Sequence, residues 1–224
     1  MIHSVQVLWM TEEVAPFVLE IAPEFNVDLA RTSALVHDDS EIVGGDILGI
    51  LKSAMNEAER KRYEADEARA IEQLSSRWPR FVNGFVYRNL LYLALRKNTA
   101  EAQLVSYLDK QASLTESWHE IFAGNRVFYN PSSGKKPPVR GSEILKLRAR
   151  YTLISRLFEC SHPFLAEFQA PDPEKALARG KPHTSESIYQ QTGFALYDCW
   201  KNIILTRGRE EGLGWLIEQK EFVV

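Results

Sequence analysis

The sequence predicts an all-α protein, and three observations lead to that expectation. Apolar residues recur at three- and four-residue steps along most segments, which is the spacing of one face of a helix. No segment shows the alternating β-branched residues of a half-buried strand. Proline is concentrated in two irregular stretches, residues 130–139 and 161–184. We therefore expect a helical bundle that is followed by an α-helical C-terminal extension.

The N-terminal segment carries apolar residues at helical spacing as far as Ile21. Pro16 has no amide hydrogen to donate, so we expect a kink or a break in the helix at this position. Residues 22–26 contain another proline and end this first element.

The second helix leads into a short polar segment. Asp28 can cap the start of this helix, whose apolar residues continue to the residue before His37. Gly44 and Gly45 break the helical pattern, and Asp46 behind them can cap another helix.

The rest of the chain is expected to be helical outside the proline-rich stretches. Residues 56–76 are rich in Glu, Arg and Lys, which predicts a long and mostly solvated helix. We expect residues 1–125 to form the main domain and residues 126–224 to form the extension. The further predicted helices are 84–96, 100–122, 142–160, 185–206 and 209–219.

Composition excludes several classes of protein. Of the 224 residues, 45% are hydrophobic and 25% are charged, which is ordinary for a globular chain. The net charge of −3 provides no basic excess for a nucleic-acid backbone, so general nucleic-acid binding is not expected. No apolar run approaches the ~20 residues of a membrane span, and the N-terminus lacks the pattern of a signal peptide. Cys160 and Cys199 lack C-x-x-C spacing, so we expect a reduced, cytoplasmic protein.

One cluster of residues points to chemistry. His37, Asp38 and Glu41 lie within about one helical turn, next to the apolar residues 34–36. An adjacent His-Asp pair is common and means little by itself, but burying a further carboxylate beside it is costly unless the group is paired or bound to metal. Imidazole and carboxylate together suit a divalent transition metal.

Two distant residues extend this cluster into a pattern. His3 opens the first helix, and Asp109 interrupts the apolar face of the predicted helix 100–122. Either residue alone is more typical of a terminus or a solvated helix face. In the order His, His-Asp, Asp, however, the sequence resembles the HD-domain metal-dependent phosphohydrolases, and most closely the bacterial 5′-deoxynucleotidases of the YfbR type.

Four segments carry the resemblance, which covers about residues 1–125. Residues 3–7 are similar to the His-Ser-x-x-Val motif of the first helix in that family. Residues 34–46 contain His-Asp-x-Ser-Glu followed by Gly-Asp, which is the most specific of the four matches. Residues 63–71 resemble a Glu-rich helix that ends in Ala-Ile, and residues 104–110 resemble the helix with the last ligand.

The resemblance implies an HD-domain helical bundle and a phosphohydrolase that releases phosphate from a (deoxy)nucleoside 5′-monophosphate. Attack would come from water activated by one divalent ion, namely Mn, Co, Mg, Zn, Fe or Ni. Glu41 is implied as the proton-transfer group, and Asp46 is implied to hold water or the sugar. The implied metal ligands are His3, His37, Asp38 and Asp109.

Family members also carry an Arg before the first His, and that Arg contacts the substrate phosphate. Here His3 follows Met1 almost directly, so either that segment is missing or the start was chosen too late. Basic residues beside the proline-rich loop can bind phosphate in place of that Arg, although a solvated surface loop is the commoner role for them. These residues are Lys135, Lys136 and Arg140.

Other functions stay open at this point. The same site chemistry supports hydrolysis of a nucleoside triphosphate or an alarmone. A non-catalytic HD module that binds a nucleotide or a partner protein is the competing class, and the retained ligands and Glu41 favour the enzyme. We expect a small-molecule nucleotide as substrate, no membrane association and a homodimer. The isolated histidines His119, His162 and His183 are expected to be structural or at the surface.

Overall fold

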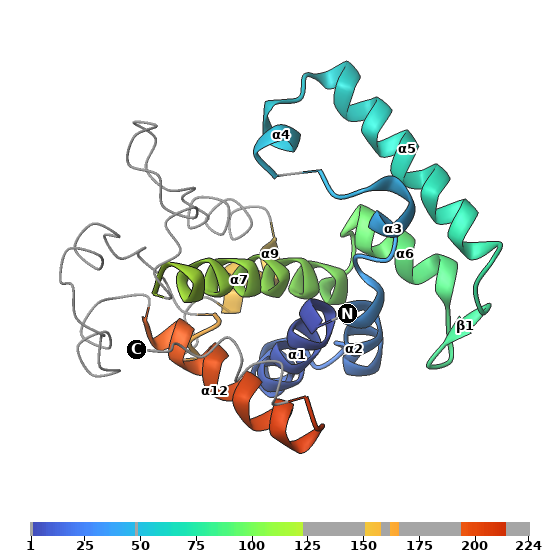
Figure 1. Cartoon of the computed structure of the whole chain (residues 1–224). Coiled ribbons are helices and arrows are strands. Elements are labelled where there is room, and N and C mark those ends of the chain that lie inside the picture. The colour runs from blue at the N-terminus through green and yellow to red at the C-terminus, as the bar shows by residue number, and fades with distance from the viewer. Residues whose placement is uncertain (1, 48, 123–150, 158–161, 166–193, 214–224) are drawn as a thin grey trace, which may run out of the picture. The chain divides into compact units, whose positions relative to one another are not determined.

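The structure is a computed structural model that describes residues 2–47, 49–122, 151–157, 162–165 and 194–213. These residues are mostly helical, with one pair of very short strands, so the predicted all-α class is confirmed (Figure 1). Within these ranges, no helix combines the length and the apolar character needed to cross a membrane. The helices are α1 (Ile2–Ile21), α2 (Val27–Val36), α3 (Glu41–Gly44), α4 (Gly49–Ala54), α5 (Glu57–Ser75), α6 (Tyr87–Arg96), α7 (Ala100–Phe122), α9 (Thr152–Leu157) and α12 (Phe194–Glu210).

We expected a kink or a break at Pro16, and the break is wrong, because helix α1 continues through this residue. The missing amide of a proline removes one intrahelical hydrogen bond. On either side of it, Val14, Ala15 and Val18 are fully or almost fully buried. The packing of these residues stabilises the helix by more than the lost hydrogen bond costs, and the helix ends at Ile21 as predicted.

Asn26, and not Asp28, caps the start of α2. The backbone of Asn26 is extended, and its side-chain oxygen accepts a hydrogen bond of 2.9 Å from the amide of Leu29. Asp28 lies inside the first turn, where its carboxylate faces Arg31 at 3.6 Å. Asp46 also fails as a predicted cap, because α4 begins only at Gly49.

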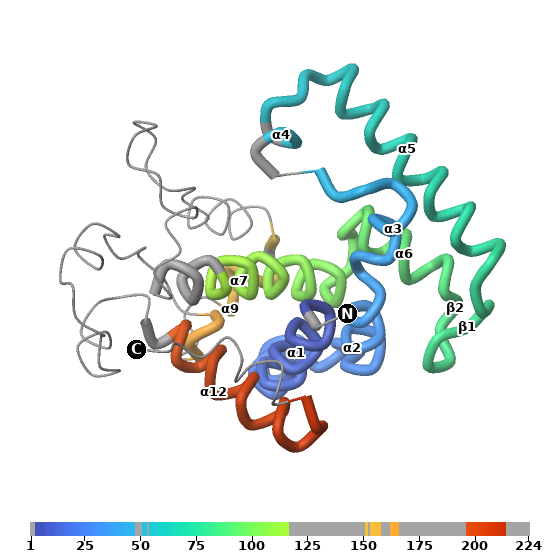
Figure 2. The backbone as a smooth tube through the Cα atoms, viewed as in Figure 1, coloured from blue at the N-terminus to red at the C-terminus, as the bar shows by residue number. Residues whose placement is uncertain are grey.

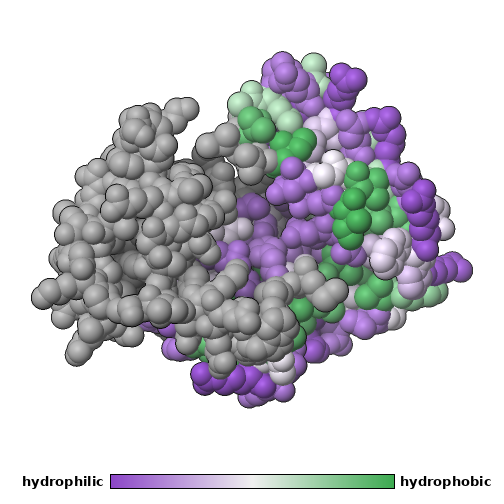
Figure 3. All heavy atoms as spheres, in the orientation of Figure 1, coloured by the Kyte–Doolittle hydropathy of each residue, from purple (hydrophilic) through white to green (hydrophobic). Residues whose placement is uncertain are grey.

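Helix α5 agrees closely with the charged helix predicted for residues 56–76. Asn56 and Glu59 form a reciprocal capping box at its start, with hydrogen bonds of 3.0 and 2.8 Å. Figure 3 shows polar side chains along much of this helix. Two of its buried residues, Ile71 and Leu74, form a core with α6 and the end of α2. That core comprises Val36, Ile71, Leu74, Tyr87, Leu90 and Leu91.

A β-hairpin joins α5 to α6 where a helix from residue 84 was expected (Figure 2). Strand β1 (Phe81–Val82) pairs antiparallel with β2 (Phe85–Val86). Both turn residues have positive φ, 47° at Asn83 and 83° at Gly84. An Asn-Gly pair favours this two-residue turn, whose twist matches that of the strands. Helix α6 therefore begins only at Tyr87.

The chain divides into two compact units, and α1 and α7 are each continuous across the division. The first unit comprises residues 1–8 and 25–106 and contains the core described above. The second comprises residues 9–24 and 107–224. The predicted boundary near residue 125 lies outside the described residues, and the division into domains 1–125 and 126–224 stays a prediction.

The second unit has its own buried side chains. The amide of Gln111 donates to the hydroxyl of Tyr107 at 2.8 Å and to the carbonyl of Phe164 at 3.2 Å. Helix α12 runs without interruption to Glu210, so the break expected after residue 206 is wrong. Its last turn is held by an ion pair of 3.1 Å between Arg207 and Glu12.

Candidate metal centre

The end of α2 positions His37. The residue before it, Val36, is buried in the core with α5 and α6, which fixes where the helix stops. The His37 side chain is itself only 8% exposed. Its Nδ1 lies 2.7 Å from the carbonyl oxygen of Ala34. A carbonyl can only accept a hydrogen bond, so Nδ1 carries the proton and Nε2 presents the lone pair that a metal ion needs.

Asp38 and His3 approach this nitrogen. Asp38 Oδ1 lies 3.2 Å from His37 Nε2, and Asp38 Oδ2 lies 3.8 Å from His3 Nε2. The rings of His3 and His37 have centroids 5.5 Å apart and an interplanar angle of 56°. The first turn of α1 and the end of α2 thus bring two imidazoles and one carboxylate together.

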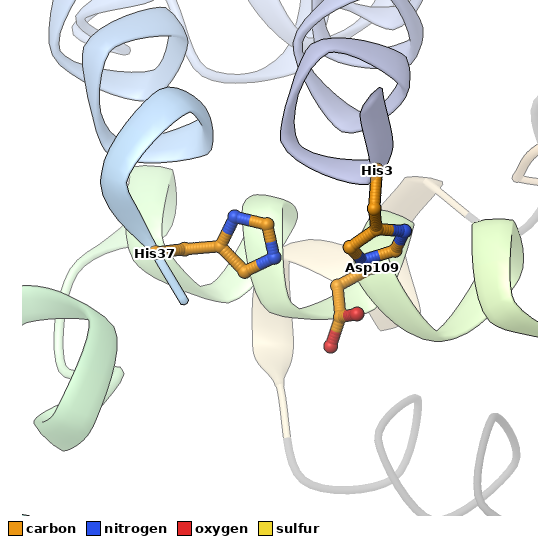
Figure 4. Close-up of side chains that lie close together, drawn as sticks. All are labelled: His3, His37 and Asp109. Carbon is orange, nitrogen blue, oxygen red and sulfur yellow. The ribbon is translucent and has the colours of Figure 1, made fainter. Parts of the chain in front are cut away.

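Asp109 completes a group of ligand atoms. His3, His37 and Asp109 each offer one atom, and these three atoms lie within 4.8 Å of one another (Figure 4). The three side chains come from α1, from the end of α2 and from α7, and they point toward one another. The Asp109 side chain is 13% exposed, and its Oδ2 lies 2.6 Å from Nζ of Lys110.

This donor set fits a divalent metal ion. Two imidazole nitrogens with carboxylate oxygens suit Zn, Fe, Co, Ni or Mn. Ligand atoms about 2.0–2.2 Å from a common ion lie within about 4.4 Å of one another, which is close to the 4.8 Å seen here. Asp38 is not one of these three residues, but its carboxylate faces both histidines.

Asp39 and Tyr87 support the loop that carries the His-Asp pair. The Tyr87 hydroxyl donates a hydrogen bond of 2.8 Å to Asp39 Oδ2. Burial raises the pKa of Asp39, and the hydrogen bond from Tyr87 opposes that rise. Burial raises the pKa of Tyr87, and the contact with Asp39 raises it further, so Tyr87 stays a protonated donor. Tyr87 was not predicted as a site residue, because no local sequence pattern links it to residue 39.

Glu41 begins α3 directly behind the predicted ligands. Its backbone amide donates to the carbonyl of Asp38 at 2.9 Å. Its side chain is 31% exposed, and Oε1 lies 3.9 Å from Nζ of Lys52 on α4. Glu41 is not among the three residues whose ligand atoms converge. Glu41 thus follows the predicted ligands directly in the chain, and its partly exposed carboxylate faces Lys52.

Asp46 is exposed and follows Gly45, whose φ of 76° is readily adopted by glycine. Tyr63 on α5 lies close enough to both Asp46 and Glu41 to feel their charges. Burial raises the pKa of Tyr63, and its hydrogen bond to Glu67 and the charges of Glu41 and Asp46 raise it further. The Tyr63 hydroxyl donates that hydrogen bond to Glu67. Several acidic groups thus surround one aromatic ring.

The remaining predicted residues lie elsewhere. His162 is buried, with Nε2 3.7 Å from Glu13 Oε1 and with Nδ1 accepting from the amide of Phe164. Its predicted structural role agrees with these contacts. The other candidates fall outside the residues whose side chains are described: Lys135, Lys136, Arg140, His119 and His183.

Comparison with known proteins gives one match. The model of a family described as 5′-deoxynucleotidase YfbR-like matches residues 1–144. Searches of curated proteins and of solved structures gave no significant match. The matched range is more than half of the chain, and it includes every residue of the candidate centre. The chain therefore belongs to the YfbR-like 5′-deoxynucleotidase family.

Proposed function

We propose that this protein is a metal-dependent phosphohydrolase that releases phosphate from (deoxy)nucleoside 5′-monophosphates. Membership of a 5′-deoxynucleotidase family supports the class of reaction. The observation that carries the proposal is the convergence of His3, His37 and Asp109 within 4.8 Å. Partly burying two imidazoles and a carboxylate together is costly unless the groups are paired or bound to an ion, which favours a metal site.

The proposed ligands are His3, His37 and Asp109, together with Asp38, whose carboxylate faces both imidazoles. A bound divalent ion would supply Lewis acidity, which lowers the pKa of water and neutralises charge on a phosphoryl group. The hydrogen bond from His37 to the carbonyl of Ala34 orients the imidazole and selects its tautomer before any ion arrives.

The reaction itself is a hydrolysis. Oxygen of water attacks phosphorus, the bond between phosphorus and the 5′ oxygen breaks, and that oxygen leaves as an alcohol after gaining a proton. Glu41 is the proposed proton-transfer group, since it follows His37 and Asp38 within about one turn of the chain and is not among the residues whose ligand atoms converge. Asp46 is proposed to hold water or the sugar, and it extends from the exposed turn after Gly45.

The proposal also specifies the class of substrate, which is a nucleoside monophosphate. Hydrolysis of a nucleoside triphosphate or an alarmone, and nucleotide binding without catalysis, are outcomes that the experiment separates. The homodimer and the cytoplasmic location expected from the sequence stay predictions.

The test uses the full chain, stripped of metal with a chelator and reloaded separately with each of the six candidate ions. Phosphate release is measured against deoxynucleoside and ribonucleoside monophosphates, triphosphates and alarmones. We expect release from monophosphates that depends on the added ion. Release from triphosphates or alarmones alone would replace the substrate class, and ion-dependent nucleotide binding without any release would support the non-catalytic module. His37→Gln is the control for contaminating phosphatases, because it removes a proposed ligand.

A further inference from the structure

Lys52 lies beside the proposed proton-transfer group. Its Nζ is 3.9 Å from Oε1 of Glu41 and 5.0 Å from the centroid of the Tyr63 ring. The three residues come from α4, α3 and α5, which follow one another in the chain. The negative face of the ring and the carboxylate both attract the ammonium group, so they hold it next to Glu41.

The ammonium group has hydrogen-bonding capacity to spare. A direct hydrogen bond between an ammonium and a carboxylate measures about 2.7–2.9 Å, so the 3.9 Å contact of Lys52 with Glu41 is a looser ion pair. The contact with the Tyr63 ring is electrostatic and does not require a donated proton at a fixed angle. The Lys52 side chain is 34% exposed, which leaves its three N–H donors within reach of a ligand.

Two other cations in the described part of the first unit have closer carboxylate partners than Lys52 has. Lys61 lies 2.9 Å from Glu57, and Arg88 lies 2.7 Å from Glu72. Both pairs are on the exposed surface of α5 and α6. Lys52 differs from them because its ion pair is long and because its partner is Glu41, whose backbone amide donates to the carbonyl of the proposed ligand Asp38.

We propose that Lys52 is a substrate-binding residue whose ammonium group contacts the phosphate of the nucleotide. This inference rests on the proposed function, in which the substrate is a phosphate monoester. Such a group carries up to two negative charges, which the site must accommodate. Glu41 adds a negative charge at the same place, and a nearby cation offsets the repulsion between that carboxylate and the arriving phosphate. Lys52 is placed both to contact the phosphate and to offset the charge of Glu41.

The test compares Lys52→Met, Lys52→Arg and wild type as full chains loaded with Mn²⁺. Calorimetric titration with inorganic phosphate measures the phosphate contact without turnover, and titration with a deoxynucleoside measures the rest of the site. We expect Lys52→Met to weaken phosphate binding by roughly ten- to a hundredfold, the usual range for one charge-assisted hydrogen bond. Lys52→Arg should retain most of the affinity, and deoxynucleoside binding should change in neither variant.

Lys61→Met is the matched control, because Lys61 is an exposed lysine that is paired with Glu57 on α5. It should bind phosphate as wild type does. Far-UV circular dichroism and metal analysis check each variant, and Lys52→Gln replaces Lys52→Met if the latter does not fold. If Lys52→Met had unchanged affinity for phosphate, or lost affinity equally for phosphate and deoxynucleoside, the proposal would be overturned. A wild type that binds phosphate through Lys52 yet hydrolyses no nucleotide would contradict only the proposed function.

Discussion

The imidazole of His37 donates its Nδ1 proton to the carbonyl of Ala34 at 2.7 Å. The acceptor lies in the last turn of α2, three positions before His37, which is the residue that follows the helix. The carbonyls at the end of a helix lack intrahelical partners. This hydrogen bond therefore gives one of them a partner and also fixes the orientation of the His37 imidazole. Local helix geometry therefore prepares Nε2 of His37 for coordination.

The first prediction concerns the proposed ligand Asp38. Asp38→Ala should lose most of the bound metal and reduce phosphate release to background, because its carboxylate faces both His37 and His3. Elemental analysis after dialysis measures the metal, and a colorimetric phosphate assay measures the activity. Asp28→Ala is the control, since Asp28 lies on the exposed first turn of α2 next to Arg31. Wild-type metal content in Asp38→Ala would remove this residue from the ligand set.

The second prediction concerns the Tyr87 hydroxyl. Tyr87→Phe removes the donor to Asp39 and should lower the free energy of unfolding by about 1–2 kcal/mol at pH 7, measured by urea denaturation. The hydrogen bond lowers the pKa of Asp39, so it favours the ionised carboxyl group. Burial nonetheless leaves that pKa above its usual value, so the folded state binds more protons just above pH 3.8. The difference in free energy of unfolding between Tyr87→Phe and wild type should therefore shrink as Asp39 becomes protonated toward pH 4.

Tyr92→Phe is the matched control for this experiment. The Tyr92 hydroxyl also donates to a carboxylate, Glu72, at 2.6 Å, but that contact is on the exposed surface. Exposed charged contacts contribute little to stability. An equal loss of free energy of unfolding in both variants would show that the contact with Asp39 stabilises the fold no more than the exposed contact of Tyr92 does.

Sequence patterns predict the long helices well, because their evidence is local. The charged residues of α5 and its sparse apolar residues repeat with the period of a helix, and the predicted range 56–76 differs little from Glu57–Ser75. The hairpin before α6 was missed for the opposite reason. Its strands have two residues each, which is too short for alternation to appear. Asn83-Gly84 was the available signal, since this pair favours a two-residue hairpin turn.

Some residues of the candidate centre could likewise be predicted from local sequence spacing, and others could not. His37, Asp38 and Glu41 lie within about one turn of the chain, so their proximity follows from local geometry. His3 and Asp109 came only from resemblance to a family pattern, because helix period cannot bring distant segments together. Tyr87 and Lys52 were missed, since their positions depend on how α6 and α4 pack against the rest of the first unit. Local spacing carries no information on such contacts.

The third prediction concerns pH and His162. Burial lowers the pKa of His162, while the nearby Glu13 opposes this shift. Below the unfolded value near 6.5 the unfolded state then binds more protons than the folded state, so stability falls as pH decreases through this range. Thermal unfolding of metal-free protein at pH 7.5, 6.5 and 5.5 should show this loss.

His162→Asn is the comparison for that measurement, since its side-chain oxygen can still accept from the amide of Phe164. The variant should be less stable at pH 7.5 because it loses ring contacts with Phe17 and Phe164. Its stability should nevertheless decrease less than that of wild type between pH 7.5 and 5.5. Identical pH dependence in both proteins would contradict the lowered pKa.

The fourth prediction separates proton transfer from metal binding at Glu41. Glu41→Ala should keep the bound metal, because Glu41 is not among the residues whose ligand atoms converge within 4.8 Å. Turnover should fall by roughly 10²-fold or more, which is the usual scale for losing general acid–base assistance. Glu41→Gln, which keeps the size of the side chain but cannot exchange a proton, should lose a similar factor.

Metal analysis and phosphate release on the same preparations decide between the roles. Glu64→Ala serves as the surface control, since Glu64 is an exposed residue of α5, and it should match wild type in both measurements. If Glu41→Ala loses its metal as Asp38→Ala does, Glu41 is a ligand. If Glu41→Gln retains wild-type turnover, the carboxylate acts through its shape or its hydrogen bonds and not by transferring a proton, and another group near Tyr63 and Lys52 must supply the proton to the leaving oxygen.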